Sequence, residues 1–141
     1  MKLRTLTPAE WGEHSELAHK IVFGKQKPAS WDRLDYVLVT ENDDGVPLCY
    51  VTCQERDAES LYWQYGGSFP GTKGTILTWA SLLIFLGYTR ERYKRLSMLI
   101  ENTNLPMLRL AMKAGLRIVG IRSFKEHVLL EHGIEFGGLN G

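Results

Sequence analysis

A glycine-rich segment in the middle of the chain is the clearest candidate for chemistry. It runs from Gly66 to Thr75 (GGSFPGTKGT), between a strand-like stretch and an apolar helical stretch. At such a turn the first backbone N–H groups of the helix have no partner within it and lie at the positive end of its dipole. The residues at this position predict a phosphate-binding loop: Gly71, Thr72, Lys73, Gly74 and Thr75.

The glycine-rich segment has two alternative interpretations besides a phosphate-binding loop. Glycine collects in turns of every kind, so a plain surface loop has the same composition. A nucleotide-binding P-loop shares the spacing of Gly66 and Gly71. That motif continues with Lys and then Ser or Thr, whereas Thr72 precedes Lys73 here. The order of the residues therefore disfavours a P-loop.

Length and charge limit the class of protein. The 141 residues predict a single domain that spans 1–141. The 17 basic and 16 acidic side chains leave a net charge of +1, which gives no electrostatic reason to expect nucleic acid or a membrane as partner. Met1–Thr5 lacks the apolar core of a signal peptide, and the apolar run Ile76–Tyr88 is too short to span a bilayer. We therefore expect a cytoplasmic protein.

The two cysteines, Cys49 and Cys53, lie four residues apart on one face of an expected strand. Four strand steps span roughly 13 Å, which is beyond the reach of a disulfide. We expect both to be half-buried free thiols in a reducing compartment.

The elements that must position the loop follow from local patterns. Thr7–Glu10 forms a capping box at the start of a helix that is expected to reach Gly24. Asn104 is expected to cap a later helix that Gly115 closes, with Leu105, Leu108 and Met112 on its buried face and Arg109 and Lys113 in solvent. The other expected elements are strands at 36–40, 46–55, 61–65, 95–101, 116–123 and 127–131 and a helix at 76–89. This order predicts a mixed α/β fold with helices on both faces of a sheet.

The segment Asn104–Gly120 (NLPMLRLAMKAGLRIVG) resembles the second conserved motif of the GNAT N-acyltransferases. That motif is an Asn that opens a helix, mixed apolar and basic residues, Gly followed by Phe or Leu, and a strand that ends in Gly. The match has no gap, and the remaining elements follow the GNAT order. The resemblance implies the GNAT fold, a mostly antiparallel sheet with a splayed parallel pair, here Leu61–Tyr65 and Leu96–Glu101. The compact chain also resembles small GNAT-like proteins encoded by bacteriophages.

The resemblance also implies acetyl-CoA or another acyl-CoA as cofactor, and a small-molecule or peptide amine as acceptor. In the family the pyrophosphate binds a loop with the pattern Arg or Gln, two residues, Gly, one residue, Gly or Ala. Gly74 matches its last position, Thr72 stands at the first glycine, and Phe69 replaces Arg or Gln. By the same resemblance Asn104 contacts the pantetheine arm, and Tyr65 borders the cleft that holds it.

Catalysis requires a group that takes the proton of the amine. In the family the leaving thiolate is often protonated by a Tyr in the helix that Asn104 opens, but Ala111 stands at that position. Glu101 is expected to act as the base and Tyr65 is a second catalytic candidate; a solvated charge and aromatic packing are their structural alternatives. The segment 24–34, with Trp31, is expected to border the acceptor site by analogy with the family.

Two classes of function remain open. The first is an N-acyltransferase that uses acetyl-CoA, and the second is a GNAT-fold protein without activity that serves as a binding or structural module. His127 and His132 have the spacing of no metal site, and no metal is expected. The sequence leaves the oligomeric state open, and a homodimer is compatible with it.

Overall fold

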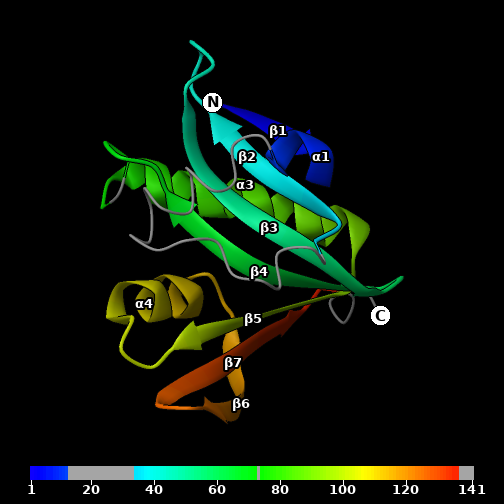
Figure 1. The fold of residues 1–141 in the computed structure, drawn as a ribbon, viewed down its shortest axis with the longest axis vertical. Coiled ribbons are helices and arrows are strands. Elements are labelled where there is room, and N and C mark those ends of the chain that lie inside the picture. The colour runs from blue at the N-terminus through cyan, green and yellow to red at the C-terminus, as the bar shows by residue number, and fades with distance from the viewer. Residues whose placement is uncertain (13–33, 73, 137–141) are drawn as a thin grey trace. The chain divides into compact units, whose positions relative to one another are not determined.

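The computed structural model describes residues 1–12, 34–72 and 74–136 (Figure 1). The predicted course of the first helix to Gly24, the segment 24–33 with Trp31, and Lys73 lie outside the described residues. The elements are β1 (Lys2–Leu6), α1 (Pro8–Gly12), β2 (Tyr36–Glu41), β3 (Pro47–Asp57), β4 (Ser60–Ser68), α3 (Ile76–Arg92), β5 (Arg95–Glu101), α4 (Leu105–Lys113), β6 (Arg117–Phe124) and β7 (His127–Glu135).

The strands of the described residues form one seven-stranded sheet in the order β1-β2-β3-β4-β5-β7-β6. The pairs β1–β2, β2–β3, β5–β7 and β6–β7 are antiparallel, whereas β4 and β5 are parallel. Because α3 connects the two parallel strands, the chain can return to start β5 in the same direction as β4. The predicted fold class, a mixed α/β sheet with a parallel pair, is confirmed.

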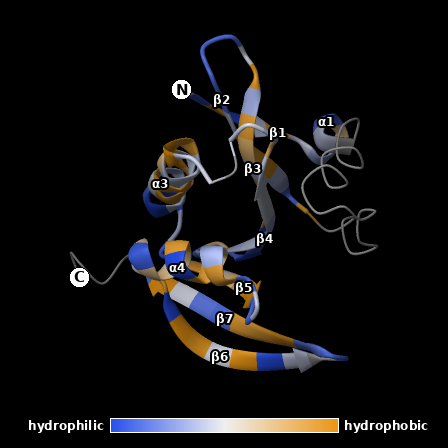
Figure 2. Ribbon diagram, turned by 90° about the vertical axis from the view of Figure 1, so that its left-hand side faces the viewer, coloured by the Kyte–Doolittle hydropathy of each residue, from blue (hydrophilic) through white to orange (hydrophobic). Residues whose placement is uncertain are grey.

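The chain divides into two compact units, Met1–Gln54 with Gln64–Gly87, and Glu55–Trp63 with Tyr88 onward. In the first unit α1 and α3 lie on opposite faces of β1, β2 and β3 (Figures 1 and 2). The strands β2 and β3 are therefore covered on both sides. Their burial is nearly continuous from Val37 to Glu41 and from Leu48 to Gln54.

The two faces of the first unit have different contents. On the α1 face the rings of Trp11 and Tyr50 lie 4.9 Å apart, and Phe69 packs against Tyr50 at 5.6 Å. On the α3 face the hydroxyl oxygens of Thr40 and Ser81 lie 2.8 Å apart and share a buried hydrogen bond. Apolar packing therefore holds one face, and a satisfied polar contact joins the other to the helix.

The capping box at the start of α1 forms as predicted. The Thr7 N–H donates to Glu10 Oε1 at 3.0 Å, and the Glu10 N–H donates to Thr7 Oγ1 at 3.2 Å. The hydrogen bond from the Thr7 backbone N–H lowers the pKa of the Glu10 carboxyl, and a hydrogen bond with the Thr7 side chain lowers it further.

Cys49 and Cys53 are free thiols on β3, as predicted, but they are buried rather than half-buried. The cause is the cover on both faces of β3. Burial, reinforced by the nearby Asp35 carboxylate, raises the pKa of the Cys53 thiol. This thiol is therefore held protonated and is a poor nucleophile.

In the second unit, the side chains of β5 alternate between buried and half-exposed positions. Leu96, Met98 and Ile100 are buried, while Ser97 and Leu99 are half-exposed on the other face. The bounds of β5 are those predicted from the sequence. The alternation shows that one face of this strand packs in a core and the other is open to ligands or solvent.

The buried face of α4 differs from the predicted one. Leu105 and Met112 are 54% and 61% exposed, Leu108 is half-buried, and Ala111 is the buried residue of the helix. Apolar residues occupy more than one stripe of α4, so periodicity alone could not select the face. The small side chain of Ala111 allows the closest approach, and the packed face is centred there.

The edge strand β6 exposes apolar side chains. Ile118, Val119 and Ile121 are 48%, 61% and 69% exposed, and β6 carries hydrophobic stretches in Figure 2. The homodimer stays a prediction, and this exposed edge strand is compatible with it.

Among the described residues, no helix combines the length and the hydropathy needed to cross a bilayer.

Candidate functional site

The glycine-rich loop is shorter than the sequence predicts. Strand β4 continues through Gly66 to Ser68, and α3 begins at Ile76, so the loop comprises residues 69–75. A Cβ at Gly66 would lie 3.2 Å from the carbonyl oxygen of Tyr50. Gly66 therefore serves the close approach of two backbones within the sheet, and not the turn.

The loop turns sharply on two glycines. Gly71 and Gly74 have φ of +88° and +76°, a conformation that other residues rarely adopt. A Cβ built at either position meets nothing within 4 Å. Space for a ligand therefore exists beside both glycines.

Thr75 caps α3, which explains its place in the loop. Its Oγ1 accepts from the Leu77 N–H at 3.2 Å and donates to the Thr72 carbonyl. Thr72 is 3% exposed, and its carbonyl also accepts from Thr78 Oγ1 at 2.9 Å. The hydroxyls of Thr75 and Thr78 thus fix the loop through the Thr72 carbonyl. The Thr72 and Thr75 N–H groups donate to backbone carbonyls of the loop, so the remaining N–H groups of the turn can meet a ligand.

Two of those N–H groups carry the candidate site. Among the residues that the structure describes, no acceptor is found for the N–H groups of Gly74 and Ile76. Both lie at the start of the 17-residue helix α3, where the helix dipole is positive. The loop can therefore bind an anion such as a diphosphate through its backbone.

Phe69 departs from the Arg or Gln of the family pattern for a structural reason. Its N–H donates to the Leu48 carbonyl at 2.8 Å, and its ring packs on Tyr50 in the core beneath α1. The side chain at this position holds the loop to the sheet and offers no positive charge to a phosphate.

Asn104 has its predicted role as a cap. Its Oδ1 accepts from the Met107 N–H at 3.3 Å, and Gly115, at φ +96°, ends the helix. The Asn104 side chain is exposed at the N-terminus of α4. Its predicted contact with pantetheine stays a prediction.

Asn104→Ala should lower the free energy of unfolding by about 1 kcal/mol, because the first turn of α4 loses its cap. Asn104→Ser keeps a capping oxygen but lacks the amide, so it should retain most of the stability. Urea unfolding of both variants checks the cap. Isothermal titration with coenzyme A then checks the second role: an unchanged dissociation constant in the folded Asn104→Ser variant would leave Asn104 with the cap alone.

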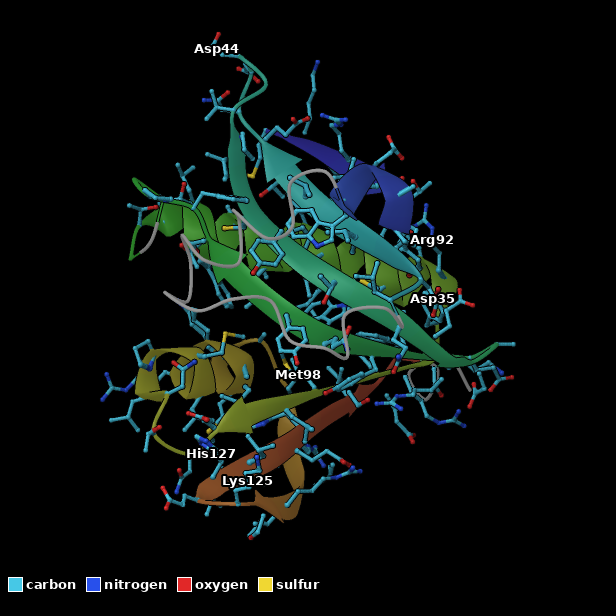
Figure 3. The ribbon with its side chains drawn as sticks, viewed as in Figure 1. Asp35, Asp44, Arg92, Met98, Lys125 and His127 are labelled. Carbon is cyan, nitrogen blue, oxygen red and sulfur yellow. The ribbon has the colours of Figure 1, made fainter. Side chains whose placement is uncertain are left out.

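Glu101 forms a pair that the sequence did not reveal. Its Oε1 lies 2.7 Å from Nδ1 of His127, and Thr103 Oγ1 donates to its Oε2 at 3.5 Å. The turn between β6 and β7, with Lys125 at φ +55°, places His127 at the end of β5 (Figure 3). Both side chains are about half exposed, at 45% and 53%. The antiparallel register of β5 and β7, which the sequence alone does not fix, creates the pair.

The other predicted residues lie as follows. Tyr65 is half-buried on β4, where its N–H donates to Thr52 Oγ1 at 3.0 Å. It belongs to the first unit with the loop, whereas Glu101 and Asn104 belong to the second. The roles of Tyr65 in catalysis and in cofactor binding stay predictions.

The two strands of the parallel pair extend beyond their paired residues. The register runs from Ser60 opposite Arg95 to Trp63 opposite Met98. Strand β4 then continues to Ser68, and β5 continues to Glu101.

Ala111 and His132 are core residues. Ala111 is 1% exposed and packs in the core. Because alanine has no hydroxyl, α4 presents no acid at that position. His132 is fully buried, and its Nδ1 lies 3.1 Å from the Leu130 carbonyl, while His127 points to the other face of β7. Within the described part of the chain, no group of His, Cys, Asp and Glu could hold a metal ion.

Solved structures identify this arrangement. The ribosomal-protein-S18-alanine N-acetyltransferase from Escherichia coli superposes with a TM-score of 0.79 at 10% identity, covering 99% of this chain and 97% of that one. The chain has the GNAT fold. A GNAT family acetyltransferase from Elizabethkingia anophelis with acetyl-CoA bound gives 0.75 at 12% identity, covering 95% and 97%. An IAA acetyltransferase from Bacillus cereus gives 0.75 at 12% identity, covering 95% and 98%.

No family model matches the sequence, and the search of curated proteins finds no match either. At 10–13% identity the structural likeness establishes the GNAT fold alone. In this fold the loop 69–75 and the helix that Asn104 caps are the segments to which the sequence resemblance assigned the coenzyme. The local geometry of these segments therefore carries the argument for function.

Proposed function

We propose that this protein is an N-acyltransferase that transfers an acetyl group from acetyl-CoA to an amine. The observation that carries the proposal is a pair of N–H groups, on Gly74 and Ile76, that have no acceptor among the described residues and lie beside open space at the start of α3. The GNAT fold supports it, as does the structural neighbour from Elizabethkingia anophelis, which has acetyl-CoA bound. Backbone donors at a helix N-terminus suit the diphosphate of coenzyme A.

The residues of this chain would divide the work in a defined way. Bound acetyl-CoA supplies the acetyl group as an activated thioester. The loop 69–75 holds the diphosphate, and Asn104 contacts the pantetheine amides. Glu101 accepts the proton that the amine nitrogen loses as its new C–N bond forms. Because Ala111 offers no hydroxyl, α4 would supply no tyrosine acid for the leaving sulfur; water would protonate it, and the rate would depend mainly on how the chain positions the two substrates.

The first test is thermal unfolding with acetyl-CoA. Ligand at about a hundred times its dissociation constant stabilises the folded state by about 2.7 kcal/mol, which should raise the melting temperature by roughly 5–10 °C. A panel of amines then reports turnover through release of free thiol. No thermal shift at millimolar acetyl-CoA would contradict the proposed cofactor.

A non-catalytic GNAT-fold protein is the second candidate. Two observations favour it: the core position of Phe69, which removes the usual charge from the loop, and Ala111 at the position of the usual acid. A clear thermal shift together with no thiol release from a broad panel of amines would support this candidate over the enzyme.

A further inference from the structure

A pocket of about 320 Å³ lies on the open face of the sheet in the second unit. Its volume is in the range of sites for small molecules. It is lined by side chains from β3, β4, β5, β6 and β7: Arg56, Tyr62, Ser97, Leu99, Arg122 and Glu131.

Strand register explains why these side chains meet. Tyr62 lies beside Ser97 in the parallel pair, and Leu99 lies beside Glu131 in the antiparallel pair. On β5 these are the half-exposed positions that alternate with the buried ones, so the pocket forms on the face that the core of this unit does not use.

The two arginines of the pocket are held differently. Arg122 Nη2 lies 2.7 Å from Glu131 Oε1, so its charge is already matched. The guanidinium of Arg56 lies 4.3 Å from the centre of the Tyr62 ring. Among the described residues, Arg56 has no carboxylate as an ion-pair partner. A guanidinium that stacks on a ring keeps its N–H groups free at its edge, where they can bind a carboxylate with two parallel hydrogen bonds.

Glu131 restricts the ligand further. Its Oε1 is taken by Arg122, while its Oε2 accepts no hydrogen bond from the described residues. The carboxylate of Glu131 would repel a dianion such as a phosphate, and its second oxygen suits an amine. The pocket thus offers a donor fork to one carboxylate and an acceptor to one amine, with Leu99 and the Tyr62 ring as apolar surface.

We propose that this pocket binds the acceptor, and that the acceptor is a small amine that carries a carboxylate, as a free amino acid does, with the carboxylate on Arg56. The inference rests on the proposed transferase function. It adds the class of acceptor and a residue that selects for it.

The first experiment measures binding without coenzyme, so it does not depend on catalysis. The proteinogenic amino acids are screened by ligand-observed NMR, and the tightest binder is titrated beside its amide. The amide should bind about tenfold more weakly, because it lacks the charge-assisted bonds to Arg56. Arg56→Ala should remove this preference. Arg117→Ala, an exposed arginine on β6 outside the pocket, should leave it unchanged.

Three binding results would overturn the proposal: no amino acid binds, the amide binds as tightly as the acid, or Arg56→Ala keeps the preference. Melting temperatures of both variants show that they are folded, which is expected because both arginines are exposed. Arg56→Lys should recover only part of the preference, since Lys has the charge without the planar fork.

The second experiment separates this proposal from the transferase function. If amino-acid binding depends on Arg56 but acetyl-CoA releases no thiol, the carboxylate site stands and the transferase function fails. If amines without a carboxylate are acetylated equally well and Arg56→Ala has no effect, the acceptor site is overturned and the transferase function stands.

Discussion

Gly74→Glu is expected to weaken binding of acetyl-CoA by about a hundredfold. The loop N–H groups would face a diphosphate, and a carboxylate on the same turn brings a like charge to within a few ångströms of it. Two unit charges about 5 Å apart near a protein surface repel by roughly 3 kcal/mol, which corresponds to about a hundredfold in affinity. Isothermal titration with acetyl-CoA measures the change.

Backbone strain must be separated from charge in this experiment. Gly74 has φ +76°, so any side chain there costs about 1 kcal/mol of stability. Gly45→Glu is a matched control, because Gly45 has φ +79° in open space in the turn between β2 and β3. Gly74→Ala adds strain at the loop without charge. Only Gly74→Glu should lose affinity strongly; equal affinity in Gly74→Glu and wild type would show that the diphosphate binds elsewhere.

Glu101→Gln is expected to lower kcat/KM by about a hundredfold to ten-thousandfold, the usual contribution of a general base. The amide keeps the shape of the side chain but cannot take a proton from the amine. The pair with His127 is about half exposed, so its loss should change stability by less than about 1 kcal/mol. A large kinetic loss with an unchanged melting temperature therefore indicates a chemical role. Initial rates with saturating acetyl-CoA measure it.

Glu135→Gln is the matched control for this prediction. Glu135 lies opposite Arg95 at the other end of the β5–β7 pair, and its Oε1 is 3.6 Å from Arg95 Nε. It removes a carboxylate and a surface ion pair without touching Glu101. If both variants have the rate of the wild-type protein, Glu101 is a solvated charge at a strand end and the base lies elsewhere.

Features that depend on neighbouring residues could be predicted from the sequence. The Thr7–Glu10 capping box, the Asn104 cap, the Gly115 terminator and the bounds of β5 depend on residues a few positions apart, and all were predicted correctly. The order of the elements was also sufficient to predict the mixed α/β sheet, and the resemblance to the GNAT family implied its parallel pair. The helix caps and the strand bounds need no information about distant contacts, because backbone preference and helix-end hydrogen bonds act within one turn.

Features that join distant segments could not be predicted from the sequence. The sequence places Gly66 in a turn, but in the structure its backbone lies against the Tyr50 carbonyl within the sheet. On α4, Ala111 rather than Met112 faces the core of its unit. The pair of Glu101 with His127 and the pocket around Arg56 depend on β7 lying between β5 and β6. Sequence periodicity assigns a residue to one face of its own strand, but the neighbour on that face is set by strand order and register, which arise from packing of the whole sheet.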